Sequence, residues 1–131
     1  MKFFAAIALA CALVFASGCA TLAPNADPVE VRAEQTVATA FETMTLFLKL
    51  ELQHEEALRT KAPRVVAFAK WLTDRQADGT PRGVAIIKSA NEVRRAYKLN
   101  RSAENRANLL AALAAVESAL AETQKHLANS K

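Results

Sequence analysis

Apolar residues near the end of the chain recur at alternating steps of four and three. The positions in this stripe are Leu109, Leu113, Val116, Leu120, Thr123 and Leu127. Steps of four and three bring side chains to one face of an α-helix, whereas a half-buried strand needs steps of two. The stripe continues across almost three heptads. It therefore predicts a long helix that buries one face against other helices.

The composition favours the same fold class for the rest of the chain. Alanine, leucine and charged residues are abundant, and the 131 residues include only three glycines and four prolines. Most of the abundant residues are strong helix formers, and β-branched residues do not alternate as they do in strands. The sequence predicts an all-α protein.

The first predicted helix covers residues 27–61. Asp27 is the expected N-cap, Pro28 suits the first helical position, and Glu30 completes a variant of the capping box. Pro63 is expected to end the helix. The expected inner face contains Val37, Phe41, Met44 and Leu48, and it is widened by Ala40 and Phe47.

Three more helices are expected after Pro63. The second covers residues 63–76, and its expected inner residues are Val65, Phe68, Ala69 and Leu72, with Trp71 beside them. Residues 77–83 contain an Asp-Gly pair and a proline, which is typical of a loop. The third helix is expected to be capped by Thr80 and Pro81, to end near Asn100 or Arg101, and to bury Ile86, Ala90, Val93 and Tyr97. Ser102 is the expected N-cap of the fourth helix.

Short connections between these helices favour antiparallel packing of neighbours. We therefore expect an up-down-up-down four-helix bundle over residues 27–131. The alternative is a three-helix bundle in which the short second helix caps one end.

The first residues of the chain have the order of a secretory signal peptide. Lys2 is followed by uninterrupted apolar residues from 3 to 16, and then by small residues up to Cys19. The apolar segment is short for a membrane span, which needs about 20 such residues. Residues 1–18 are therefore expected to be removed, together with Cys11.

The sequence Ala16-Ser17-Gly18-Cys19 resembles the lipobox of bacterial lipoproteins, although Ala16 stands where leucine is usual. The resemblance implies that Cys19 is acylated and becomes the new N-terminus, so that the lipid bilayer is a partner. It also implies the periplasmic side of the outer membrane, because Ala20 replaces the Asp that signals inner-membrane retention. The alternative is an ordinary cleavage site and a released protein. Residues 19–26 then form a tether that reaches at most about 29 Å.

The charge distribution is uneven. The net charge is only +4 at pH 7, which is too small to indicate a nucleic-acid partner. However, residues 27–58 contain an excess of five acidic side chains and residues 75–106 an excess of five basic ones. Attraction between an acidic and a basic helix is one explanation. The other is a basic tip formed where two interhelix turns meet, which would suit an anionic protein or a cell-wall polymer. Its expected residues are Arg59, Lys61, Arg64, Lys98, Arg101 and Arg106.

Candidates for chemistry are few. Glu51 and His54 form Glu-x-x-His, a motif that di-iron bundles use in two copies, but His126 lacks the matching glutamate. We therefore expect no catalytic residues and no cofactor, and the sequence indicates a lipid-anchored binding or scaffolding module. Two alternatives stay open. A bundle that binds a small ligand would have a cavity beside Phe68 and Trp71, and a metal-dependent enzyme would hold its metal at Glu51 and His54.

Overall fold

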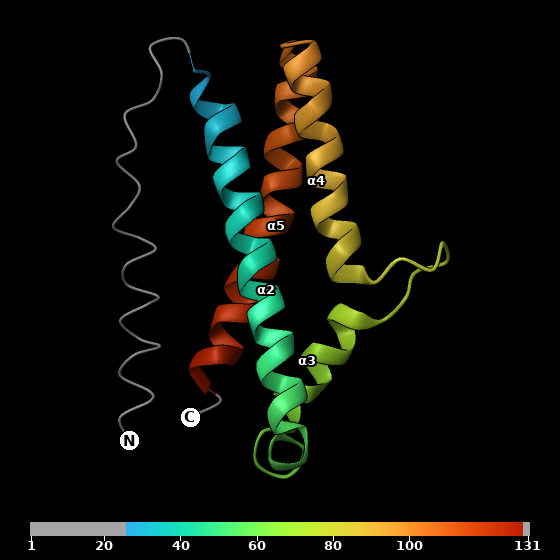
Figure 1. Cartoon of the computed structure of the whole chain (residues 1–131). Helices are drawn as coiled ribbons and strands as arrows, with labels where there is room; N and C mark the ends of the chain where they lie inside the picture. The colour runs from blue at the N-terminus through green and yellow to red at the C-terminus, as the bar shows by residue number, and fades with distance from the viewer. Residues whose placement is uncertain (1–25, 130–131) are drawn as a thin grey trace.

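The computed structural model describes residues 26–129, and in that range it contains four helices (Figure 1). They are α2 (Pro28–Lys61), α3 (Pro63–Thr73), α4 (Arg82–Leu99) and α5 (Ala103–Asn129). The predicted all-α bundle of four helices is confirmed. None of the helices in the described range combines the length and the hydropathy that crossing a bilayer requires. The predicted signal peptide (residues 1–18), Cys19 and most of the predicted tether (residues 19–26) lie outside the described residues.

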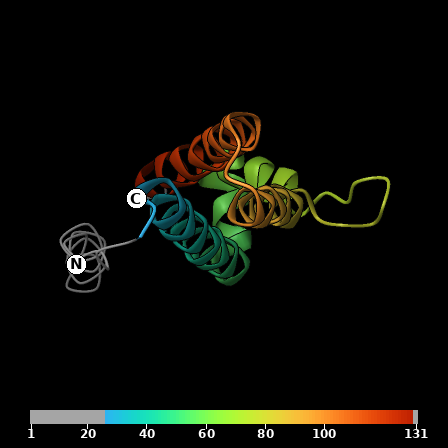
Figure 2. The ribbon, with the colours of Figure 1, turned by 90° about the horizontal axis from the view of Figure 1, so that it is seen from above.

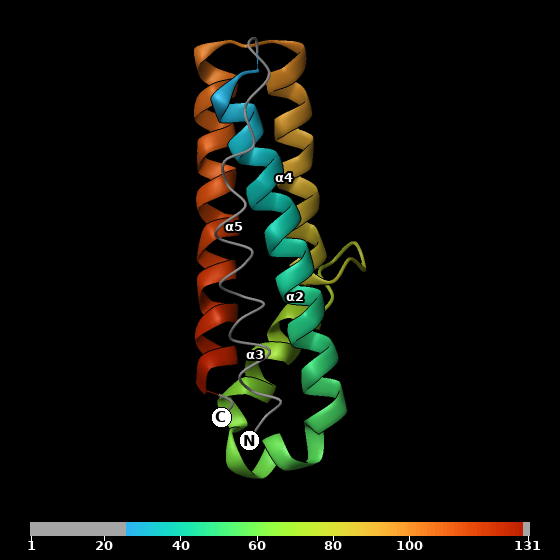
Figure 3. The same ribbon diagram turned by 60° about the vertical axis from the view of Figure 1, so that its left-hand side comes forward.

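The directions of the helices do not strictly alternate. The Tyr97 hydroxyl near the end of α4 donates a 2.7 Å hydrogen bond to the Asp27 carboxylate at the start of α2, so α2 and α4 are antiparallel. Helix α3 also returns along α2, and therefore α3 and α4 run in the same general direction (Figures 1 and 3). Helices α2, α4 and α5 lie at the corners of a triangle, with α3 continuing the α4 corner (Figure 2).

The loop between α3 and α4 explains this course. Residues 74–81 form a small hairpin, in which the Gln76 amide donates to the Thr80 carbonyl and the Gly79 amide donates to the Gln76 carbonyl, both at 2.9 Å. Gly79 has a φ of +80°, a conformation that glycine adopts readily. Because the hairpin closes on itself, the chain leaves and re-enters the bundle at nearly the same place. The loop that we predicted is present, but it does not reverse the chain.

The predicted helix caps are mostly confirmed. The Asp27 carboxylate accepts hydrogen bonds from the Val29 and Glu30 amides at 2.8 and 3.4 Å. The Ser102 hydroxyl accepts one from the Asn105 amide at 3.1 Å. The prediction was wrong for Thr80, which bonds to Asp78 inside the hairpin instead of capping α4. Helix α3 also ends at Thr73, three residues before the predicted end.

The core follows the predicted stripes, but Phe41 of α2 lies outside it. The buried residues of α2 are Ala33, Val37, Ala40, Met44 and Phe47, and those of α5 are Leu109, Leu113, Val116, Ala119 and Thr123. Phe41 was expected inside, but it is exposed. The small side chains of Ala33 and Ala40 are fully buried, whereas Phe41, next to Ala40, is 56% exposed. Leu120 is only partly buried, next to the buried Ala119.

Candidate functional site

The structure separates the six residues of the predicted basic tip into two groups. Lys98, Arg101 and Arg106 surround the turn from α4 to α5, beside the start of α2. Arg59, Lys61 and Arg64 lie where α2 ends and α3 begins. Helix α2 has 34 residues, which corresponds to about 50 Å at 1.5 Å per residue. The prediction of one basic tip was therefore wrong, because it assumed that α4 runs parallel to α2.

The basic residues of α4 pair with the acidic residues of α2 instead. The ion pairs are Arg94–Glu34 at 3.4 Å, Lys98–Glu30 at 3.3 Å, Arg101–Glu30 at 3.3 Å and Arg101–Asp27 at 3.8 Å. The Tyr97 hydrogen bond is the main cause of a lowered pKa at Asp27, and the same bond raises the pKa of Tyr97. Attraction between an acidic and a basic helix thus accounts for much of the uneven charge.

The Glu-x-x-His segment coincides with an irregularity in α2. His54 has φ −121° and ψ 16°, which are not helical angles. Burial is the main cause of a raised pKa at Glu51, and the neighbouring Glu55 adds to it. Within residues 26–129 there is no group of three or more His, Cys, Asp or Glu side chains placed to hold a metal ion. Glu51 and His54 are therefore not part of such a group.

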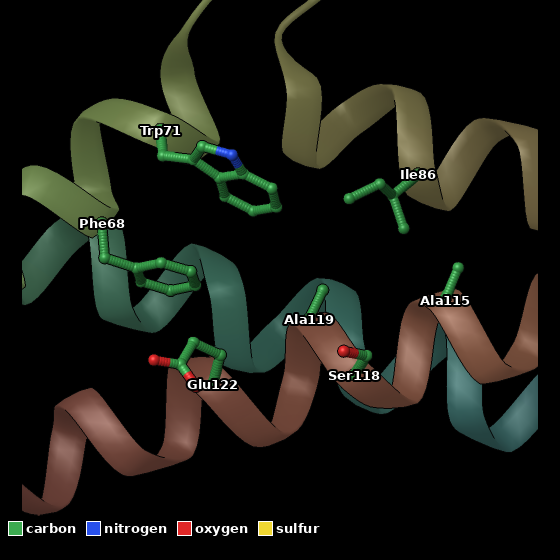
Figure 4. Close-up of a pocket in the computed structure, with 7 residues that line it drawn as sticks. All are labelled: Phe68, Trp71, Ile86, Ala115, Ser118, Ala119 and Glu122. Carbon is green, nitrogen blue, oxygen red and sulfur yellow. The ribbon is translucent and has the colours of Figure 1, made fainter.

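An apolar groove lies between α3, α4 and α5 (Figure 4). Its volume is about 520 Å³, and its surface is mostly apolar. The lining residues are Phe68, Trp71, Ile86, Ala115, Ser118, Ala119 and Glu122. The groove lies beside Phe68 and Trp71. This is where a bundle that binds a small ligand was expected to have a cavity.

Four flat side chains form a stacked column along the groove. The rings of Phe68 and Trp71 stack with centroids 5.5 Å apart and planes 14° from parallel. His126 of α5 stacks on Phe68 at 4.6 Å, and the Arg82 guanidinium lies 5.0 Å from the centre of the Trp71 ring. Because these residues come from α3, α4 and α5, the column fixes the aromatic wall of the groove.

The groove is lined by α3 and α4 on either side of the hairpin that joins them, and by α5. On its inner side the junction is tight, since a Cβ at Gly83 would lie 3.3 Å from a Leu72 methyl carbon. On its outer side α5 presents the small residues Ala115, Ser118 and Ala119, and they leave the gap unfilled. The sequence analysis named Phe68 and Trp71 as possible pocket residues, but it missed the α5 residues, whose only signal is their small size.

Glu122 is the charged residue of the lining, and it already has partners. Its carboxylate lies 3.4 Å from the Lys125 ammonium and 3.2 Å from Nε2 of His126. Ser118 adds a hydroxyl group to the lining. The groove thus combines an aromatic and aliphatic wall with polar groups at Ser118 and Glu122, an arrangement typical of sites for small molecules.

No family model matches this chain, and no curated protein or solved structure matches it.

Proposed function

We propose that the protein is a lipid-anchored binding module of a bacterial envelope, and that the groove between α3, α4 and α5 is its binding site. The observation that supports binding is the groove itself. Its volume of about 520 Å³ lies within the range of about 300 to 1,000 Å³ found for small-molecule sites. The fixed column of Phe68, Trp71 and His126 lowers the cost of binding, because these side chains need no further ordering.

The groove favours a small, largely apolar ligand. Its wall offers ring faces and methyl groups, and a ligand gains free energy mainly by removing such surfaces from water. The polar groups at Ser118 and Glu122 would orient a ligand that has a hydrogen-bonding end.

The anchor is the second part of the proposal. Lipobox residues 16–19 support acylation at Cys19, and Ala20 supports the outer membrane with the domain facing the periplasm. More than one acyl chain is required for stable attachment, because a single chain gives only marginal binding.

Variants in α5 test the groove. Ala115 lines it, whereas Ala114 is the preceding residue, is also exposed, and is not part of the lining. Ala115→Phe should obstruct the groove, and Ala114→Phe is the matched control. Each protein is purified from membranes in mild detergent, and the molecules extracted from it are compared by mass spectrometry. We expect an apolar compound with the wild type and with Ala114→Phe, and its loss from Ala115→Phe.

Tryptophan fluorescence gives an independent measurement. Trp71 is the only tryptophan of the chain and it lines the groove. Adding the extracted compound back to the stripped protein should shift the Trp71 emission in the wild type and not in Ala115→Phe. The proposed site is refuted if all three proteins retain the same compounds in the same yield.

A further inference from the structure

The turn between α4 and α5 exposes a large apolar residue. Leu99, the last residue of α4, is 88% exposed, the highest value among the exposed large apolar residues in the described part of the chain. It lies between Lys98 and the nearby Arg101, at the end of the bundle where α2 begins (Figures 1 and 3). Single exposed leucines are common on protein surfaces, so Leu99 suits a contact with a membrane only together with the cations around it.

The surface around Leu99 is cationic despite the acidic residues nearby. The side chains of Lys98 and Arg101 are 67% and 53% exposed, whereas their partners Glu30 and Asp27 are only 13% and 14% exposed. The carboxylates therefore lie beneath the cations. Arg95 and Arg106 are also exposed. Glu104 in the first turn of α5 is exposed as well, and the four exposed cations Arg95, Lys98, Arg101 and Arg106 outnumber it.

Arg106 lies near the start of α2, where its charge acts on the Tyr97 hydroxyl that is bonded to Asp27. Arg106 also lies in the first turn of α5, where the helix dipole disfavours a cation. A negatively charged partner outside the bundle would reverse this penalty.

We propose that the α4–α5 turn is a second membrane contact, in which Leu99 enters an anionic bilayer surface and the surrounding cations bind its headgroups. The inference rests on the proposed anchor, because residues 19–26 lead from Cys19 to the start of α2 at this same end. Their reach of at most about 29 Å keeps the turn near the bilayer. Leucine beside lysine and arginine is the composition of segments that lie in the membrane interface.

The contact has a defined consequence for the anchored domain. Each cation near an anionic surface contributes about a fivefold factor in binding. With Cys19 acylated, the turn binds intramolecularly, so that even weak contacts hold one end of the bundle on the bilayer. The turn from α2 to α3 is then held away from the membrane.

Labelling the acylated protein tests the contact. Acylation blocks the Cys19 thiol, so Leu99→Cys introduces a single free thiol for an environment-sensitive fluorophore. Thr60→Cys, an exposed position at the far end of α2, is the control for the label. Both proteins are placed in vesicles of phosphatidylcholine with about one-third phosphatidylglycerol, and a water-soluble quencher is added. We expect several-fold less quenching at position 99 than at position 60.

Charge reversal tests the role of the cations. Arg106→Glu should increase quenching of the label at position 99, whereas Lys61→Glu, the same reversal of charge at the opposite end, should not. Flotation of the vesicles tests the lipid anchor at Cys19 separately from the membrane contact of the α4–α5 turn. A protein that floats but is quenched equally at positions 99 and 60 overturns the membrane contact and leaves the anchor. A protein that does not float refutes the anchor and this inference with it. Equal protection in vesicles of phosphatidylcholine alone overturns the binding of anionic headgroups.

Discussion

Leu113→Ala should remove a large part of the stability of the bundle. Leu113 is 2% exposed and belongs to the core that α5 forms with α2 and α4. Replacing a leucine at such a site by alanine costs about 2 to 5 kcal/mol, because apolar contacts are lost and a cavity remains. A domain of this size has a total stability of about 5 to 15 kcal/mol. The substitution should therefore lower Tm by about 10 to 30 °C.

A leucine three residues earlier on the same helix provides a matched control. Leu110 is 42% exposed, so Leu110→Ala makes the same chemical change on the surface and should cost about 0.5 kcal/mol. Thermal and urea unfolding followed by circular dichroism at a helical wavelength measure both variants, with full-length protein in detergent. The core described above is refuted if the two variants melt within a few degrees of each other.

Three further predictions concern the cap, the Asp27–Tyr97 bond and the anchor. Ser102→Ala should cost about 1 kcal/mol in urea unfolding, whereas Ser89→Ala on the exposed face of α4 should cost less. Because the pKa of Asp27 is lowered in the fold, its stabilisation is present above its ordinary value of 3.8 and is lost as the pH falls below it. Tyr97→Phe should flatten this acid dependence, and an unchanged pH profile would contradict it. Cys19→Ala should leave an unprocessed or carbonate-extractable product, and a wild-type protein with an unmodified N-terminus would disprove acylation.

The helices were predictable because their signals are local. Asp27 and Ser102 cap the helices that they were expected to cap, and the steps of four and three in α5 place Leu109, Leu113 and Val116 in the core. Such signals depend on neighbours within one or two turns, and a single sequence contains them.

The direction of α4 was not predictable in the same way. It depends on the hydrogen bonds that close the hairpin, from the Gln76 amide to the Thr80 carbonyl and from the Arg82 amide to the Asp74 carbonyl. An Asp-Gly turn is equally compatible with a loop that reverses the chain. Because α4 was expected to run parallel to α2, Lys98 and Arg101 were predicted at the wrong end of the bundle. The exposure of Phe41 next to the buried Ala40 has a similar origin, because the partner helix decides which of two adjacent apolar residues faces it.

The sequence indicated only part of the groove lining. Phe68 and Trp71 stand out as aromatics at helical spacing, for which burial in the core is the more common explanation. Phe68 and Trp71 form one wall of a groove because the side chains of Ala115 and Ser118, more than forty positions later, are too small to fill the space beside them. Small residues on an exposed helix face have no distinct pattern until their neighbours in space are known.

The closed hairpin makes the bundle tolerant of added sequence. Its ends are held together by the bridge between Arg75 and Pro81 and by the Arg82 amide, which donates to the Asp74 carbonyl at 2.9 Å. A segment grafted at the tip, next to Asp78, would begin and end at neighbouring points, so that its closure entropy would grow only with the logarithm of its length. An epitope or a fluorescent protein at the tip would then report on the helical domain in living cells without touching its core.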